Sequence, residues 1–163
     1  MQQKYVGSSD WGFLARVKRH LGKRTMLGSG DLFGPHDVVR MMESTGVDGV
    51  AVARGCIGNP WVFQQIRDLL AGREPASPTL SEQHHAILCH WRYAIECHGE
   101  AAAVRKTRTH AIKYASHHPE PIRVRDAFVG ARNAADFQAV LDAWYSSSGY
   151  SSSNDRVGEE TVR

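Results

Sequence analysis

Residues 28–31, Gly-Ser-Gly-Asp, and residues 53–55, Ala-Arg-Gly, decide how the first half of this chain is expected to fold. Each stretch follows a short apolar run, and about twenty residues separate the two. Successive strand-to-loop turns of a (β/α)8 barrel have this spacing, and the loops after strands seven and eight of such barrels often hold a phosphate group. The pattern predicts two neighbouring parallel strands with an anion site where they end.

The residues around these turns predict alternating helices and strands. Asp10 can cap a helix, and Pro35 suits the first position of a second helix, which ends at Gly46. The first part of the chain therefore reads helix, strand, helix, strand, helix, with the strands at 24–27 and 48–53. The connections are short enough for the two strands to be parallel.

A change of architecture is expected near residue 75. Residues 72–78, Gly-Arg-Glu-Pro-Ala-Ser-Pro, have the composition of a linker, and no strand signal follows them. Four helices are expected beyond it, from residue 79 or 81 to about 97, from 100 to about 116, at 123–129 and at 133–145. The predicted fold class is α/β followed by all-α, the last βα units of a (β/α)8 TIM barrel joined to a small helical bundle. The predicted parts are 1–73, the end of the barrel, 79–145, the helical domain, and 146–163, a Ser-rich disordered tail.

Bulk properties limit the possible functions. At 163 residues the chain is too short for a whole (β/α)8 barrel, which takes about 250 residues. A formal charge of +3 permits a polyanionic partner without requiring one. Three cysteines, an odd number, favour a reduced and hence cytoplasmic location. We expect no membrane association, because no apolar run is long enough for a span and the N-terminus lacks the shape of a signal peptide.

The turns carry groups that suit a phosphate. Backbone N–H groups in a glycine turn favour an anion, Ser29 adds a hydroxyl donor, and Arg54 adds a bidentate fork. A phosphate would repel Asp31, so this carboxylate is interpreted as holding the loop or orienting a neighbouring donor. Ordinary barrel turns without a ligand are the alternative, because a lone Gly-x-Gly is a weak signal.

Several segments in order resemble the tRNA-dihydrouridine synthases. They are Gly-Ser-Gly-Asp at 28–31, Thr-Gly-Val-Asp-Gly-Val at 45–50, Ala-Arg-Gly at 53–55 and Gly-Asn-Pro-Trp-Val-Phe at 58–63. Residues 5–11 and Arg108-Thr109-His110 extend the resemblance to about residues 2–145, more loosely in the helical part. The resemblance implies enzymes that reduce the C5=C6 bond of uridines in tRNA, with FMN as cofactor and NADPH as its reductant.

By the same resemblance, five residues would hold the FMN phosphate: Ser29, Gly30, Asp31, Ala53 and Arg54. Two of them depart from the family pattern, since Ser29 replaces an asparagine and Ala53 replaces a glycine. Serine loses one donor, and alanine narrows the approach to the backbone. We expect weakened rather than abolished phosphate contact.

No catalytic residue is assigned in this chain. The family's acid is a cysteine on a loop in the first half of the barrel, and none of the three cysteines here occupies that position. We interpret Cys56 as a packing residue at the strand mouth, and Cys89 and Cys97 as core residues of a helix. The chain alone is therefore expected to be inactive. We expect it to be a monomer, or to need the missing N-terminal half of the barrel.

The second predicted helix of the bundle has two different faces. Val104, Ala111 and Ala115 share an apolar face at helical spacing. The residues opposite or flanking it, expected to contact RNA by family resemblance, are Arg105, Lys106, His110 and Lys113. A merely solvated face is the alternative, and Arg108, near the apolar edge, could equally form a structural ion pair.

The remaining side chains suggest no further chemistry. The histidines and cysteines of residues 84–98 lack the spacing of a metal site, so no metal is expected. We expect the aromatic residues Trp91, Tyr93, Trp144 and Tyr145 to pack between helices. Two other functions stay open: a non-catalytic RNA-binding remnant, and a different FMN or sugar-phosphate barrel such as a dihydroorotate-dehydrogenase relative. The basic helices and the Gly-Asn-Pro-Trp segment argue against the latter.

Overall fold

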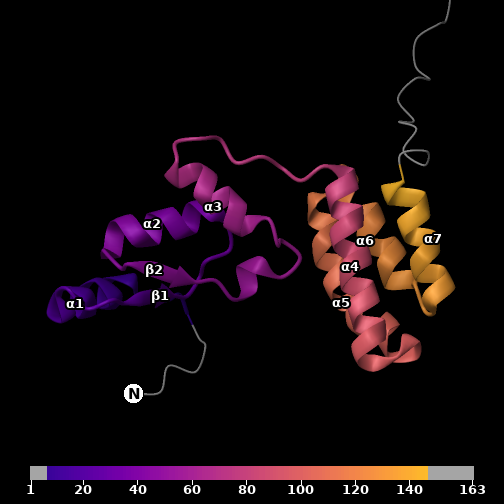
Figure 1. The fold of residues 1–163 in the computed structure, drawn as a ribbon, viewed down its shortest axis with the longest axis horizontal. Coiled ribbons are helices and arrows are strands. Elements are labelled where there is room, and N and C mark those ends of the chain that lie inside the picture. The colour runs from indigo at the N-terminus through magenta and orange to yellow at the C-terminus, as the bar shows by residue number, and fades with distance from the viewer. Residues whose placement is uncertain (1–6, 147–163) are drawn as a thin grey trace, which may run out of the picture. The chain divides into compact units, whose positions relative to one another are not determined.

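The structure, a computed structural model, describes residues 7–146 and divides the chain into two compact units, residues 1–77 and 78–163. The described part is mostly helical, with one small parallel sheet in the first unit (Figure 1). None of its helices is long and apolar enough to cross a membrane. Apart from Ser146, the predicted tail lies outside the described residues.

The first unit alternates helices and strands in the predicted order. Its elements are α1 (Trp11–Leu21), β1 (Leu27–Ser29), α2 (Pro35–Thr45), β2 (Gly49–Ala51), the 3-10 turn η1 (Arg54–Cys56) and α3 (Val62–Leu70). Asp10 caps α1, since its carboxylate accepts a hydrogen bond from the Phe13 N–H at 2.8 Å. Gly46 ends α2 in the left-handed conformation, with a φ of 72°.

The two strands are parallel, as predicted, but both differ in extent from the prediction. The paired residues are Leu27 with Gly49, Gly28 with Val50, and Ser29 with Ala51. The first strand therefore lies later than 24–27, and the second covers only the centre of 48–53. Gly28 is buried within its strand, where a Cβ would come within 2.7 Å of the Met41 Sδ. A larger residue here would have to displace the Met41 side chain, so the close approach of α2 favours a glycine in the strand.

Helix α2 covers one face of the sheet, and the opposite face is bare in the described part of the chain. The core beneath α2 consists of Leu32, Val38, Met41, Val47, Val62 and Ile66. On the opposite face the Leu27 side chain is 63% exposed, and Ser29 and Ala51 are exposed as well. Two adjacent strands taken from a larger sheet would present such a face.

The second unit is a bundle of helices joined by short turns. Its elements are α4 (Leu80–His98), α5 (Glu100–Tyr114), the 3-10 turn η2 (Ala115–His117), α6 (Pro121–Gly130) and α7 (Ala134–Tyr145). Thr79 begins α4 with a capping box, in which its hydroxyl accepts from the Glu82 N–H and the Glu82 carboxylate accepts from the Thr79 N–H. Helix α6 begins earlier than the predicted residue 123 because Pro121 takes the first helical position.

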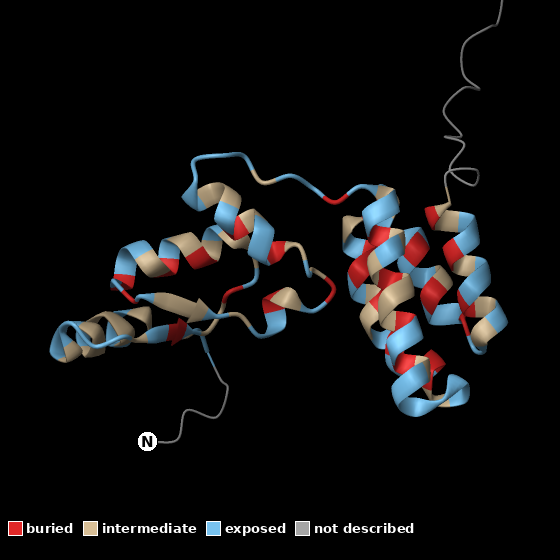
Figure 2. Ribbon diagram, in the orientation of Figure 1, coloured by how far each residue is buried: buried red, intermediate tan, exposed pale blue. Residues whose placement is uncertain are grey.

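Aromatic rings fill the core of the bundle. Trp91 of α4 stacks on Phe137 of α7 with ring centroids 4.4 Å apart, and Phe128 of α6 lies 5.3 Å from the same Phe137 ring. Ile87 and Leu141 are also fully buried. In Figure 2 buried positions recur along each of the four helices between exposed ones, as expected of helices that each bury one stripe.

Two buried polar side chains tie the turns of the bundle together. His118 is 3% exposed, its Nδ1 accepts from the Glu120 N–H at 2.9 Å, and its Nε2 lies 2.9 Å from the Trp144 carbonyl oxygen. Because a carbonyl only accepts, Nε2 carries the proton and the ring is the neutral Nε2–H tautomer. Gln83 is equally buried and donates to the carbonyl oxygens of Pro78 and His117. The contacts of His118 with Trp144 and of Gln83 with His117 join segments that are distant in the sequence.

Candidate functional site

The ends of β1 and β2 form a strand-end corner, defined here as Ser29, Gly30, Asp31, Ala53 and Arg54. Carboxyl ends of adjacent parallel strands meet at one edge of a sheet, so the residues that follow them become neighbours. The Arg54 Nη2 lies 3.2 Å from the Asp31 Oδ1, which joins the two loops directly. The structure thus brings together the residues that the sequence singled out for a phosphate.

Asp31 holds the loops of this corner, in keeping with its interpretation from the sequence. Its Oδ2 accepts from the Ser9 N–H at 2.6 Å, while its Oδ1 faces Arg54. Gly30 makes the turn possible, since its φ is +114° and a Cβ there would meet the Ser9 Oγ at 2.0 Å. The Trp11 indole N–H donates to the Gly30 carbonyl oxygen at 3.1 Å. Three segments of the first unit therefore fix the backbone of the corner.

The donors that remain open at this corner are mostly backbone groups. No described residue accepts a hydrogen bond from the N–H groups of Gly30, Asp31 or Ala53. The Arg54 side chain is 71% exposed, with its guanidinium 5.1 Å from the centroid of the Phe33 ring. An anion could therefore be met by three N–H groups and one guanidinium.

Some donors near the corner are engaged elsewhere, among them the expected donor Ser29. The Ser29 hydroxyl donates to the Ala51 carbonyl oxygen at 3.0 Å, so its proton links the strands instead of pointing to a ligand. At the N-terminus of α2, Asp37 accepts from the N–H groups of Phe33 and Gly34 at 3.0 and 3.1 Å. The sequence signal for this cap is Asp37 itself, an acid at the third position of a helix that begins with Pro35, where it can accept from the N–H groups at the helix start.

The three cysteines are free thiols and differ in exposure. Cys56 is half-buried against the core of the first unit, and its thiol donates to the Ala53 carbonyl oxygen at 3.0 Å, which fits the packing interpretation. Cys89 is half-buried and lies 3.5 Å from the His85 Nε2. The prediction that Cys97 is a core residue is wrong. It is exposed in the last turn of α4, beyond the buried positions of that helix.

Helix α5 has the two faces that the sequence predicts. Val104, Ala111 and Ala115 are buried, whereas Arg105, Lys106 and Lys113 are exposed and His110 is half-buried. Arg108 is half-buried and donates to the Ala131 carbonyl oxygen at 3.0 Å, so its structural partner is a backbone group. The cations of this face are the ones that could meet a polyanion.

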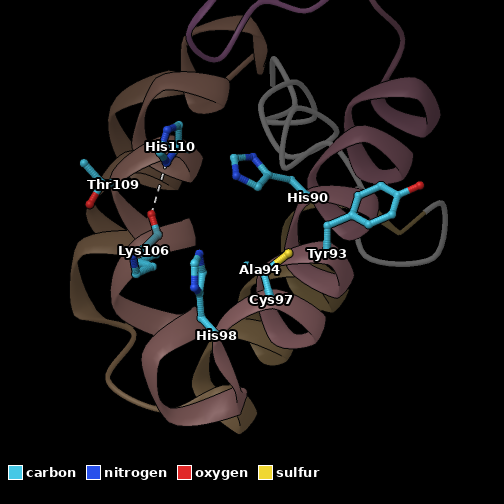
Figure 3. A pocket seen from close by; sticks show the side chains of 8 residues that line it. All are labelled: His90, Tyr93, Ala94, Cys97, His98, Lys106, Thr109 and His110. Atoms are coloured by element: carbon cyan, nitrogen blue, oxygen red, sulfur yellow. Dashed lines mark hydrogen bonds between the residues drawn. The ribbon is translucent and has the colours of Figure 1, made fainter.

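A cavity between α4 and α5 was not anticipated from the sequence. Its volume is about 490 Å³, and its walls include His90, Tyr93 and His98 of α4 and Lys106, Thr109 and His110 of α5. Figure 3 shows His90 and His98 reaching from one helix and His110 from the other toward the space between them, with Tyr93 turned outward. Tyr93 is 66% exposed, so the prediction that it packs between helices is wrong.

Comparison with known proteins identifies the family. The profile of the family described as dihydrouridine synthase (Dus) matches residues 1–147. Proteins named probable tRNA-dihydrouridine synthase align over 86% of this chain: one from Mycobacterium tuberculosis is 33% identical and one from Mycobacterium leprae is 32% identical. A third with the same name, from Rickettsia typhi, is 32% identical over 86% of the chain.

The alignments cover a smaller share of these relatives than of this chain. They span 36% of the Mycobacterium tuberculosis protein, 37% of the Mycobacterium leprae protein and 46% of the Rickettsia typhi protein. The profile nevertheless covers the strand-end corner and the helices of the bundle together. The alternative of a different FMN or sugar-phosphate barrel is thereby set aside, and the chain belongs to the dihydrouridine synthase (Dus) family.

Proposed function

We propose that this chain supplies the phosphate-holding corner and the RNA-binding helices of a tRNA-dihydrouridine synthase, which reduces the C5=C6 bond of uridines in tRNA with FMN and NADPH. Family membership supports the reaction class, and the names of the bacterial relatives support the tRNA substrate. The observation that carries the proposal is the contact of Arg54 with Asp31, because it joins the two loops that carry the unbonded N–H groups of Gly30, Asp31 and Ala53.

The residues of the strand-end corner fit the phosphate of FMN. The N–H groups of Gly30, Asp31 and Ala53 would donate to its oxygens, and Arg54 would supply the balancing positive charge. Ser29 would act by joining the two strands through its bond to Ala51. When bound, FMN supplies the hydride that reduces the uracil ring. Asp31 would hold Arg54 in place for this contact, while the Ser9 N–H that it accepts from offsets part of its own charge.

The bundle would hold the RNA through helix α5. Arg105, Lys106 and Lys113 stand exposed opposite the buried stripe, where phosphate oxygens can reach them without disturbing the core. His110 lies beside them at the edge of the cavity. In this proposal the chain contributes binding groups, and the proton that completes the reduction comes from the family's loop cysteine elsewhere in the barrel.

Comparing FMN with riboflavin tests the corner, because the two differ only in the phosphate. We expect the chain to bind FMN more tightly than riboflavin, and Arg54→Met to reduce this preference about tenfold, the effect of one lost charge-assisted contact. Arg16→Met is the matched control, since Arg16 is also exposed and also lies near a carboxylate and a phenylalanine ring. An Arg54→Met variant that keeps the full preference would refute the assignment.

Product formation and tRNA binding test the rest. Incubated with unmodified tRNA, FMN and NADPH, the chain alone is expected to bind tRNA in a salt-dependent way, because its cations contact phosphates. It is expected to form no dihydrouridine, because its two strands, with one bare face, do not make a closed barrel. Dihydrouridine in the digested tRNA would contradict the expected inactivity. Salt-dependent tRNA binding without any FMN binding would favour the alternative of a non-catalytic RNA-binding protein.

A further inference from the structure

The charges around the α4–α5 cavity favour an anion. Lys106 is the only permanent cation among the lining residues, three imidazoles join it, and no carboxylate is present among them. About 490 Å³ is enough space for a group of nucleotide size. Metal binding does not account for the imidazoles, since within residues 7–146 no group of three or more His, Cys, Asp or Glu side chains is arranged to hold an ion.

Two of the imidazoles form a close pair across the helices. The rings of His90 and His110 meet edge to face with centroids 4.8 Å apart. The His110 Nδ1 lies 3.1 Å from the Lys106 carbonyl oxygen, so Nδ1 carries a proton and Nε2 has none to donate while the ring is neutral. Burial, together with the charge of a protonated His110, holds the pKa of His90 below its usual value. A neutral His110 therefore offers no ring N–H to an anion in the cavity.

We propose that this cavity binds one phosphate group of an RNA strand and that the His90–His110 pair takes up a proton as the phosphate enters. Protonation gives the His110 Nε2 a hydrogen to donate, and the anion stabilises the resulting imidazolium. Lys106 supplies the charge that attracts the phosphate at every pH of interest. That the phosphate belongs to RNA rests on the proposed function, whereas the anion site itself does not.

The pH dependence of anion binding in this cavity should come from the His90–His110 pair and from His98. Among residues 7–146, the other titratable side chains that line the cavity or contact the pair are Tyr93, Cys97 and His98 on α4, and Lys106 and Tyr114 on α5. Burial raises the pKa of Tyr114, which keeps this phenol neutral. Anion affinity should therefore rise as the pH falls from 7.5 to 6.0.

The test compares variants of the 163-residue chain in binding a fluorescent tRNA transcript at pH 7.5 and 6.0, at constant salt. His110→Asn is the informative variant, because the asparagine amide can keep the bond to the Lys106 carbonyl oxygen but cannot be protonated. We expect the wild-type chain to gain about tenfold more affinity on acidification than His110→Asn. Lys106→Met should weaken binding at both pH values more than Lys113→Met, which removes an exposed cation of the same helix outside the cavity.

A second measurement uses inorganic phosphate as the probe. Added phosphate should shift the NMR signals of the His90 and His110 rings and raise their titration midpoints, while the exposed His85 ring stays unchanged. The same pH response in His110→Asn and wild type, or no selective ring shift, would overturn the inference even if tRNA binds. Selective ring shifts without tRNA binding at either pH would support the anion site and refute the proposed RNA partner.

Discussion

Replacing His118 by alanine should destabilise the bundle without touching either proposed binding site. The ring accepts a hydrogen bond from the Glu120 N–H, donates one to the Trp144 carbonyl, and packs edge to face with the Tyr145 ring, with centroids 5.1 Å apart. Each hydrogen bond contributes about 1 kcal/mol net and the ring contact about another 1, so we expect a loss of about 3 kcal/mol. Hydrogen exchange of amides in α6 and α7 should then accelerate on the order of a hundredfold.

Hydrogen exchange is the suitable assay because it reads the bundle separately from the first unit. His85→Ala is the control, since that imidazole is exposed on α4, and it should change exchange by less than about threefold. His118→Gln, whose amide can still donate to the Trp144 carbonyl, should fall between wild type and alanine. A loss below about 1 kcal/mol for His118→Ala would refute the view that this tautomer holds the turns together.

Three further changes address the rest of the molecule. Tyr145→Phe should be neutral or slightly stabilising at pH 7, because no described residue bonds the buried hydroxyl. Burial raises the pKa of the Tyr145 phenol, so urea unfolding should show wild-type stability falling above pH 10 while the stability of the variant does not. Asp48→Asn should destabilise the first unit at pH 7 and match the stability of wild type near pH 2. The hydrogen bond from Lys18 lowers the pKa of Asp48, so the stability that this carboxylate contributes is lost as the pH falls through the lowered value. A difference in stability that persists in acid would contradict this. Gly55→Ala should unfold the first unit at lower temperature by calorimetry, because a Cβ would lie 2.0 Å from the Leu32 carbonyl oxygen, and an unchanged transition would disprove that packing.

Local signals in the sequence predicted the elements well and their register less well. Caps such as Asp10 and Thr79 involve neighbours three residues away, so their side chains alone mark where a helix begins. The limits of β1 follow its pairing with β2 from Leu27 to Ser29, a contact between segments that no periodicity records. Strand limits therefore followed from tertiary packing that became visible only in the structure.

The same distinction explains the functional sites. The strand-end corner could be predicted because parallel strands bring the residues after each strand together, and Asp31 and Arg54 follow neighbouring strands. The cavity could not, because His90 and His110 meet only once α4 and α5 pack in one register. The use of the Ser29 proton between strands was equally hidden, since the hydroxyl has several acceptors within reach of its rotamers.

The contacts that shape the strand-end corner also affect the order in which the protein can form. Asp31 reaches Ser9 and Arg54, so the bonds that fix the corner span only 22 and 23 residues of chain. Contacts of such short sequence separation lose little chain entropy on closing and can form quickly. A nascent polypeptide could therefore assemble this corner as soon as η1 has left the ribosome, before the helical bundle has emerged.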